Sequence, residues 1–195
     1  MVNIVDRVKN ILLTPKEEWP VIAGETTTVP ELYTNYIMLL AAIPAVSMFI
    51  GWCVVGLPFV GRVSMMTGLT MMVTQYVMAL IGVFVLSLVI DFLAPNFGGE
   101  KNPIQALKVA AYSMTAAWLA GIFQILPLLS ILAIVGLYSL YLLYLGLPVM
   151  MKVPTEKAVP YTVVIIVAGI VIWVIVGAVS AIFIPTPTFT IPRIR

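Results

Sequence analysis

The longest part of the chain without Asp, Glu, Lys or Arg is VAAYSMTAAWLAGIFQILPLLSILAIVGLYSLYLLYLGLPVMM, residues 109–151. A single helix of these 43 residues would be about 65 Å long at 1.5 Å per residue. A hydrocarbon layer about 30 Å thick needs only about 20 apolar helical residues, so the stretch must fold back on itself. Pro127 cannot donate a backbone hydrogen bond and marks the break. We therefore predict two spans, Leu107–Leu126 and Leu128–Met150, joined by a tight hairpin.

Three further stretches, residues 32–61, 63–90 and 158–192, also contain no charged residue. Each is long enough for one crossing. Hydrophobic residues make up 62% of the chain and charged residues 9%, against about 25% charged in soluble domains. The predicted fold class is an all-α integral membrane protein, a bundle of five transmembrane helices. The remaining predicted spans are Tyr36–Val55, Met66–Ile90 and Tyr161–Ile184.

The residues before the first span predict a short amphipathic helix that lies in the headgroup plane of the membrane. Its apolar side would hold Ile4, Val5, Val8, Ile11 and Leu12, and its polar side Asp6, Arg7, Lys9 and Asn10.

A second short helical turn is predicted to begin at Thr14, because Thr14 and Glu17 have the spacing of a capping box and Pro15 fits the first helical position. Pro20 is expected to keep this turn short. Trp19 within it is expected to anchor the segment at the membrane interface.

The orientation follows from the lysines and arginines, which favour the cytoplasmic side. A cytoplasmic N-terminus places seven of the ten on that side and three on the other. We therefore expect an amphipathic cytoplasmic segment over residues 1–32, the transmembrane domain over 33–184, and an extended external tail over 185–195. The seven are Arg7, Lys9, Lys16, Lys101, Lys108, Lys152 and Lys157; the three are Arg62, Arg193 and Arg195.

Asp91, at the end of the second span, is the only acidic residue in or beside a span. A charge at mid-membrane costs roughly 3 kcal/mol or more, so such residues are functional candidates. Two interpretations stay open: an ion pair at the helix end with Lys101 or Lys108, and a role in proton or cation handling.

Other polar side chains within the spans are candidates for bonds between helices or for lining a polar crevice. Tyr144 lies near the predicted interface and fits an aromatic belt. The rest of this set is Gln75, Tyr112, Gln124 and Tyr138.

Small residues recur at four-residue spacing in two spans and mark faces where helices approach closely. Packing within one bundle explains them; an interface with a second copy or another membrane protein is the alternative. They are Ala106, Ala110, Ser113, Ala117 and Gly121 in the third span, and Gly177 and Ala181 in the fifth.

The composition also excludes several chemistries. Histidine is absent and Cys53 is the only cysteine, which removes disulfides, thiolate zinc sites and histidine-based acid–base mechanisms. Met65, Met66, Met71 and Met72 cluster, and their thioethers could bind copper(I), but methionine is also an ordinary filler of apolar interiors. We therefore predict no metal, no cofactor, no nucleic-acid partner and no catalytic pair.

Several segments resemble the Yip family, five-span membrane proteins named for interaction with Ypt/Rab GTPases. Glu31-Leu32-Tyr33 is similar to the family's acidic-Leu-Tyr motif, and Ala111-Tyr112 to its Gly-Tyr motif. Thr14-Pro-Lys-Glu-Glu-Trp19 is similar to the Pro and Trp motif of the bacterial branch, which implies a bacterial inner membrane. Thr34-Asn35 and Ala111 depart from the eukaryotic motifs, so we do not transfer the GTPase-binding role.

Two functions remain in view. The first is a non-enzymatic inner-membrane protein that organises the membrane or acts as a scaffold for lipids and proteins. The second is a small transporter or channel, alone or as an oligomer, whose path would be lined by the polar groups of the spans.

Overall fold

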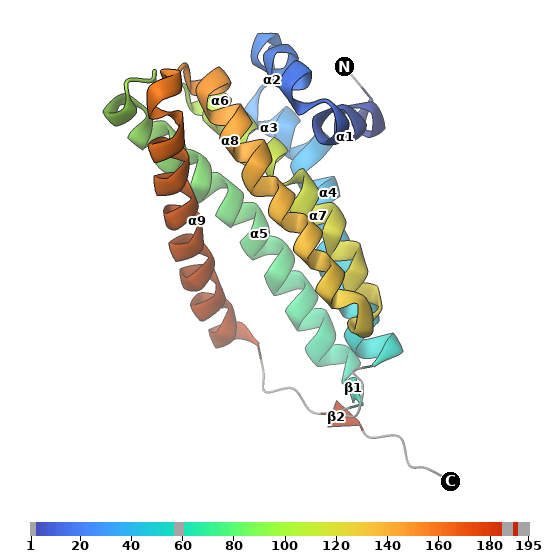
Figure 1. Cartoon of the computed structure of the whole chain (residues 1–195). Helices are drawn as coiled ribbons and strands as arrows, with labels where there is room; N and C mark the ends of the chain where they lie inside the picture. Colours follow the sequence, from blue (N-terminus) through green and yellow to red (C-terminus); the bar gives the residue numbers. More distant parts are fainter. Residues whose placement is uncertain (1–2, 57–60, 185–188, 191–195) are drawn as a thin grey trace.

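The computed structural model describes residues 3–56, 61–184 and 189–190. Five long helical segments form a bundle, and two short helices pack across one of its ends (Figure 1). We call that end the N-terminal end and the other the distal end. The elements are α1 (Ile4–Leu13), α2 (Pro15–Gly24), α3 (Val29–Leu32), η1 (Tyr33–Ile37), α4 (Met38–Phe49), η2 (Ile50–Val55), β1 (Arg62–Val63), α5 (Met65–Leu93), η3 (Ala94–Phe97), α6 (Pro103–Ser113), α7 (Thr115–Ala120), η4 (Gly121–Ile125), η5 (Pro127–Leu137), α8 (Tyr138–Met151), α9 (Thr155–Phe183) and β2 (Phe189–Thr190).

The predicted all-α fold with five membrane-spanning helices is confirmed. Each of the five segments is long and apolar enough to cross a hydrocarbon layer. The spans are Val29–Val55, Met65–Phe97, Pro103–Ile125, Pro127–Met151 and Thr155–Phe183.

The first span begins earlier than predicted because a capping box starts it at Thr28. The Thr28 backbone N–H donates to Glu31 Oε2 at 2.8 Å, and the Glu31 N–H donates to the Thr28 hydroxyl. The prediction of a capping box at Thr14 is wrong. The Thr14 hydroxyl donates to the Asn10 carbonyl of α1, and Thr14 makes no side-chain cap bond to α2. Pro15 does occupy the start of α2.

The predicted hairpin break at Pro127 is confirmed. Helix η4 ends at Ile125, Leu126 is extended with φ −111° and ψ 100°, and η5 starts at Pro127. A proline disfavours helical geometry in the residue before it, which explains the conformation of Leu126. The chain therefore reverses over a single residue, and η4 packs against η5.

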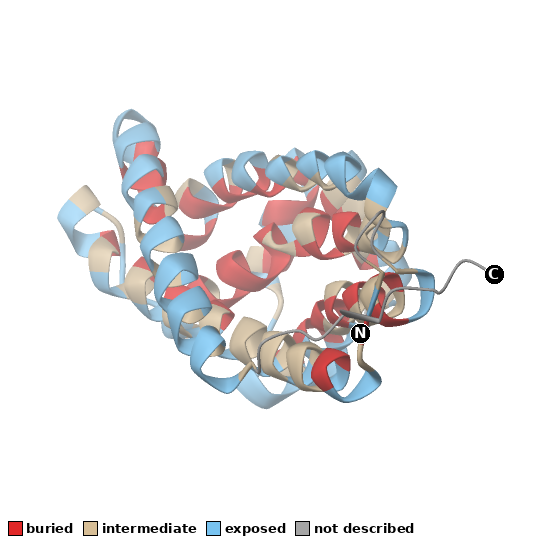
Figure 2. Ribbon diagram, turned by 90° about the horizontal axis from the view of Figure 1, so that it is seen from below, coloured by how far each residue is buried: buried red, intermediate tan, exposed pale blue. Residues whose placement is uncertain are grey.

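The third span is the most buried of the five, whereas the last is mostly exposed. Helix α6 packs against α5 on one side and α8 on the other, and α9 packs against α5 and α8. Figure 2 shows the buried residues on the inward faces of the helices. The outward side chains of α9 are large and apolar, as hydrocarbon contact requires.

At the distal end, β1 pairs antiparallel with β2, with Arg62 opposite Thr190 and Val63 opposite Phe189. This two-residue pairing joins the loop before α5 to the segment after α9. The other residues of the predicted extended tail, 185–188 and 191–195, lie outside the described residues.

Candidate functional site at the N-terminal end of the bundle

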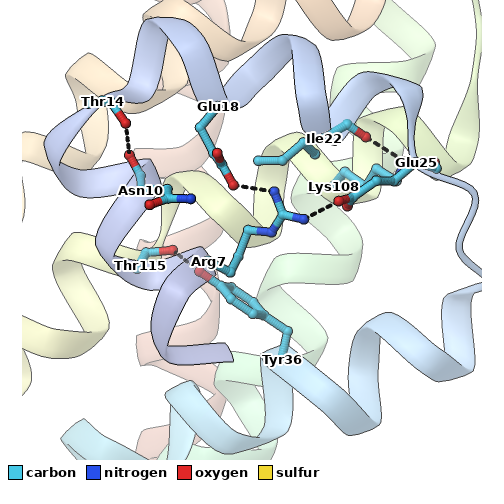
Figure 3. A network of polar contacts seen from close by, with 9 residues as sticks. All are labelled: Arg7, Asn10, Thr14, Glu18, Ile22, Glu25, Tyr36, Lys108 and Thr115. Carbon is cyan, nitrogen blue, oxygen red and sulfur yellow. Dashed lines mark hydrogen bonds and ion pairs between the residues drawn. The ribbon is translucent and has the colours of Figure 1, made fainter. Parts of the chain in front are cut away.

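Arg7 is the centre of a buried polar network between α1 and α2. Its Nη1 pairs with Glu18 of α2 and its Nη2 with Glu25, just after α2 (Figure 3). The guanidinium also lies 5.7 Å from the centre of the Tyr112 ring. Burial alone would lower the pKa of Arg7, but the hydrogen bond and charge of Glu25 outweigh it and hold the pKa above its usual value. The guanidinium is therefore a permanent charge.

The prediction that Arg7 lies on the polar side of the first helix is wrong. The amphipathic helix forms, with Ile11 fully buried, but Arg7 is only 4% exposed. Positions 4, 7 and 11 share one face of a helix, so the side chain of Arg7 follows Ile4 and Ile11 toward the bundle. The helix thus turns a charge inward, and the carboxylates of α2 compensate it.

The C-terminal end of α2 is held by side chains from α6. Lys108 Nζ donates to the carbonyls of Ile22 at 2.9 Å and Glu25 at 2.5 Å, and Gln105 Nε2 donates to the Ala23 carbonyl at 2.9 Å. The last carbonyls of a helix have no partner within it and attract cations. Two side chains of one span therefore supply the donors that α2 lacks.

Tyr138 fixes α1 in the same way. Its hydroxyl donates to the Leu12 carbonyl, in the last turn of α1, at 3.0 Å. The sequence left open whether Tyr138 bonds across helices or lines a crevice, and the structure shows a bond across helices. Both short helices are thus tied to the bundle at their C-terminal ends.

The sequence predicted that Trp19 anchors α2 at the membrane interface, but Trp19 lies in the core. It is 1% exposed, and its indole lies so close to Gly146 of α8 that an added Cβ there would come within 2.6 Å of it. Helix α2 also continues through Pro20 to Gly24, which corrects the expected short turn. Pro20 and Lys16 are both exposed, so water can reach the Lys16 carbonyl that Pro20 cannot bond.

An aromatic layer lies beneath the Arg7 network. Tyr36 and Tyr112 have ring centres 4.5 Å apart, and Trp19 meets Tyr112 edge-on at 6.5 Å. The Thr115 hydroxyl donates to the Tyr112 carbonyl at 2.7 Å, so Tyr36 is the donor in its 2.6 Å bond to Thr115. This layer separates the charges from the apolar interior.

The network borders an open cavity of about 610 Å³ between α1, the linker after α2, the start of the first span and α6. Arg7, Glu25 and Glu31 give it charge, and Tyr36 and Tyr112 give it aromatic surface. Glu31-Leu32 and Tyr112, the counterparts of the two family motifs, meet at this cavity. The lining residues are Ile4, Arg7, Gly24, Glu25, Thr26, Thr27, Glu31, Leu32, Asn35, Tyr36 and Tyr112.

Among the predicted polar candidates, only Tyr112 lies in this cavity. Asp91 is half-buried near the C-terminal end of α5, and within the described residues it pairs with neither Lys101 nor Lys108. The expected ion pair is therefore absent there, since Lys108 bonds α2. Gln75 and Gln124 are half-buried within their spans, and Tyr144 is 40% exposed on α8.

The small residues of the two spans lie in different surroundings. Ala106, Ala110 and Ser113 are buried, Ala117 is half-buried, and Gly121 is so close to Pro44 that a Cβ would lie 2.5 Å from the proline Cβ. Gly177 and Ala181, in contrast, are exposed on α9, and within the part of the chain that the structure describes no atom of another element comes within 4 Å of a Cβ at Gly177. This pair therefore does not pack within the bundle.

The sequence placed Arg7 on the polar side of its helix and Lys108 beside Asp91, and it made no prediction for Glu18 or Glu25. The pairing of Arg7 with Glu18 and Glu25 spans 11 and 18 residues, so no local pattern predicts it. A usable signal was the position of Arg7 on the face of Ile4 and Ile11.

Five apolar spans with two short helices tied across one end define a multi-span membrane protein. The Yip1 domain matches residues 9–176, so the chain belongs to the Yip1 domain family. It is similar to inner membrane protein YohC of Escherichia coli K12 and of E. coli O6:H1 CFT073, with 32% identity over 117 residues in each. That match covers 58% of this chain and 60% of each relative. No solved structure matches the chain.

Proposed function

We propose that this protein is a non-enzymatic protein of a bacterial inner membrane that organises the bilayer around it, with its N-terminus in the cytoplasm. The observation that carries the proposal is the docking of α1 and α2 on the bundle by buried hydrogen bonds and ion pairs. Membrane lipids are the partners under this proposal.

The outer surface of the docked pair supports contact with a membrane surface. Val5, Leu13 and Val21 are 66%, 69% and 51% exposed, and Lys9 and Lys16 are exposed beside them. Apolar side chains next to lysines are typical of helices that lie in the headgroup region. Because α2 is bonded to α6 and α1 to α8, insertion of the two short helices into one leaflet would act on the whole bundle.

The test replaces exposed apolar residues and leaves the buried network intact. The variant Val5→Ser/Leu13→Ser, reconstituted in vesicles of mixed zwitterionic and anionic lipid, should lose any effect of the protein on vesicle diameter and lipid packing. The matched control Asp6→Ser/Glu17→Ser changes exposed polar residues of the same helices and should behave as the parent chain. Equal behaviour of all three proteins would overturn the proposal.

Deletion of residues 1–20 is a less clean test, because it removes the buried Arg7, Ile11 and Trp19 together. The orientation is tested separately. A cysteine placed at exposed Lys16 in a Cys53→Ser background should react with a membrane-impermeant thiol reagent only after the cytoplasmic side is opened.

Transport receives less support. Tyr112 and Asp91 line two different hollows, and neither Gln75, Gln124 nor Tyr138 lines either of them. A conducting path would need these groups along one water-accessible channel. Native mass spectrometry in lipid would report both retained lipids and any second copy.

A further inference from the structure

A second hollow, separate from the Arg7 network, lies on the outer side of α5 at the N-terminal end of the bundle. Its volume is about 460 Å³, and its lining holds one acid and one base among apolar side chains. The residues are Val85, Leu88, Val89, Asp91, Phe92 and Lys101. It sits where the charge-free part of α5 ends, at the expected boundary of hydrocarbon and headgroups.

Asp91 lacks a partner that its chemistry requires. Its Oδ1 is buried, and no residue that the structure describes donates a hydrogen bond to it. The nearby Tyr161 hydroxyl is used by the Ile90 carbonyl at 2.6 Å. A buried carboxylate oxygen without a donor is costly, so rotation of the Asp91 carboxylate toward the hollow is favoured by a ligand there that brings N–H donors and positive charge.

The opposite charge and an apolar track lie in the same hollow. Lys101 Nζ is 5.6 Å from the centre of the Phe92 ring and has no ion pair within the described residues. Leu88 and Phe92 are 50% and 67% exposed on the side of α5 that faces the hydrocarbon. The carboxylate and the apolar side chains of α5 therefore share this hollow with the ammonium of Lys101, which comes from the loop before α6.

We propose that this hollow binds a phospholipid whose headgroup ends in a primary ammonium, with the ammonium at Asp91, the phosphate at Lys101 and an acyl chain along Leu88 and Phe92. A primary ammonium has three N–H donors for the unpaired oxygen, whereas a quaternary ammonium has none. The hollow is therefore selective for an ethanolamine over a choline headgroup. This hollow holds no residue of α1 or α2, so lipid binding here does not depend on whether their exposed surface acts on the membrane.

The test compares lipids of identical acyl chains on the full chain. Native mass spectrometry from nanodiscs should show phosphatidylethanolamine retained at least about fivefold over phosphatidylcholine and over phosphatidylglycerol. Asp91→Asn should bring the ethanolamine-to-choline ratio close to one, and Lys101→Gln should weaken both lipids. Glu100→Gln is the matched control, because exposed Glu100 pairs with Lys152 outside the hollow, and its ratio should be unchanged.

Equal retention of the two zwitterionic lipids by the parent chain, or an unchanged ratio in Asp91→Asn, would overturn the proposal. Preference for phosphatidylglycerol would mean that Lys101 binds an anion without an ammonium at Asp91, which also overturns it. A second measurement uses the parent chain alone, so the proposal can still be tested if a substituted protein does not fold. Carbodiimide labelling of Asp91 in the parent chain should be slower in phosphatidylethanolamine vesicles than in phosphatidylcholine vesicles, and equal rates count against the proposal.

Discussion

Two ion pairs at the same end of the bundle both join a basic side chain to a carboxylate, but they differ in burial and in what surrounds them. Arg7 and Glu18 have side chains 5% and 8% exposed, and both belong to helices packed on the bundle. Lys152 and Glu100 meet at 2.7 Å, but their side chains are 70% and 65% exposed on loops. The first pair lies within a network of helix ends and aromatic rings, and the second lies in water.

The difference follows from desolvation. A buried charge that loses its partner keeps the full cost of its removal from water, whereas an exposed charge is solvated again at once. The buried site is therefore expected to determine whether α1 and α2 stay docked. Loss of the exposed ion pair is expected to change the stability little. Four substitutions, taken from the largest expected loss of stability to the smallest, test this difference.

The largest effect is expected for Arg7→Ala, which leaves Glu18 buried without a compensating charge. The free energy of unfolding should fall by about 3–5 kcal/mol. Thermal unfolding in detergent micelles, followed by circular dichroism, measures it. In the double variant Arg7→Met/Glu18→Gln much of the lost stability should return, because the one carboxylate left without its partner, Glu25, has a side chain 35% exposed to water. A single variant as stable as the parent chain would show that the pair does not hold the helices.

Lys108→Met should have the next largest effect. It removes a donor to the Ile22 and Glu25 carbonyls at the end of α2. The Ile22 carbonyl keeps the Glu25 N–H at 3.3 Å, but the Glu25 carbonyl loses the Lys108 ammonium, and a carbonyl left without its donor costs about 1–3 kcal/mol. Faster proteolysis of the linker after Gly24 should accompany the loss. Lys16→Met, an exposed change on α2, is the control and should show neither effect.

Tyr138→Phe removes one hydroxyl and little else. Its bond to the Leu12 carbonyl holds the end of α1, so the expected loss is about 0.5–1.5 kcal/mol. Hydrogen exchange should increase in the last turn of α1 but remain unchanged in α2. Tyr144→Phe, on the same helix and 40% exposed, should leave both rates as they are.

The smallest effect is expected for Lys152→Ala. An exposed ion pair contributes about 0–1 kcal/mol and is screened by salt. Unfolding temperatures of this variant and the parent chain should agree at moderate ionic strength. A loss as large as that of Arg7→Ala would contradict the comparison on which these expectations rest.

The spans were predictable because each depends on composition over about 20 residues. Charges are expelled from hydrocarbon, so the charge-free stretches alone gave five helices. Pro127 gave the hairpin because its backbone chemistry is local. The start of the first span was missed, although Thr28 and Glu31 carry a capping signal of the same kind as the one assigned to Thr14.

The polar site was less predictable, because its partners are far apart in sequence. Tyr112 and Tyr138 were selected as polar groups within spans, but Arg7, Trp19 and Lys108 were expected at the surface or beside Asp91. The Tyr138 hydroxyl bonds Leu12, 126 residues away, and Lys108 bonds Ile22, 86 residues away. No helical or strand period connects residues at such distances.

The sequence by itself determined that this chain has five membrane-spanning helices. The free energy of transfer into hydrocarbon is a sum over the residues of one segment and does not depend on which other segments pack against it. Only the tertiary structure decided where its few charges lie. Arg7, in an amphipathic helix, is buried because Glu18 and Glu25 come within reach. Asp91, for which the sequence offered Lys101 and Lys108 as partners, pairs with neither within the described residues. A charge is stabilised by the specific groups around it, and those groups come together only when the chain folds.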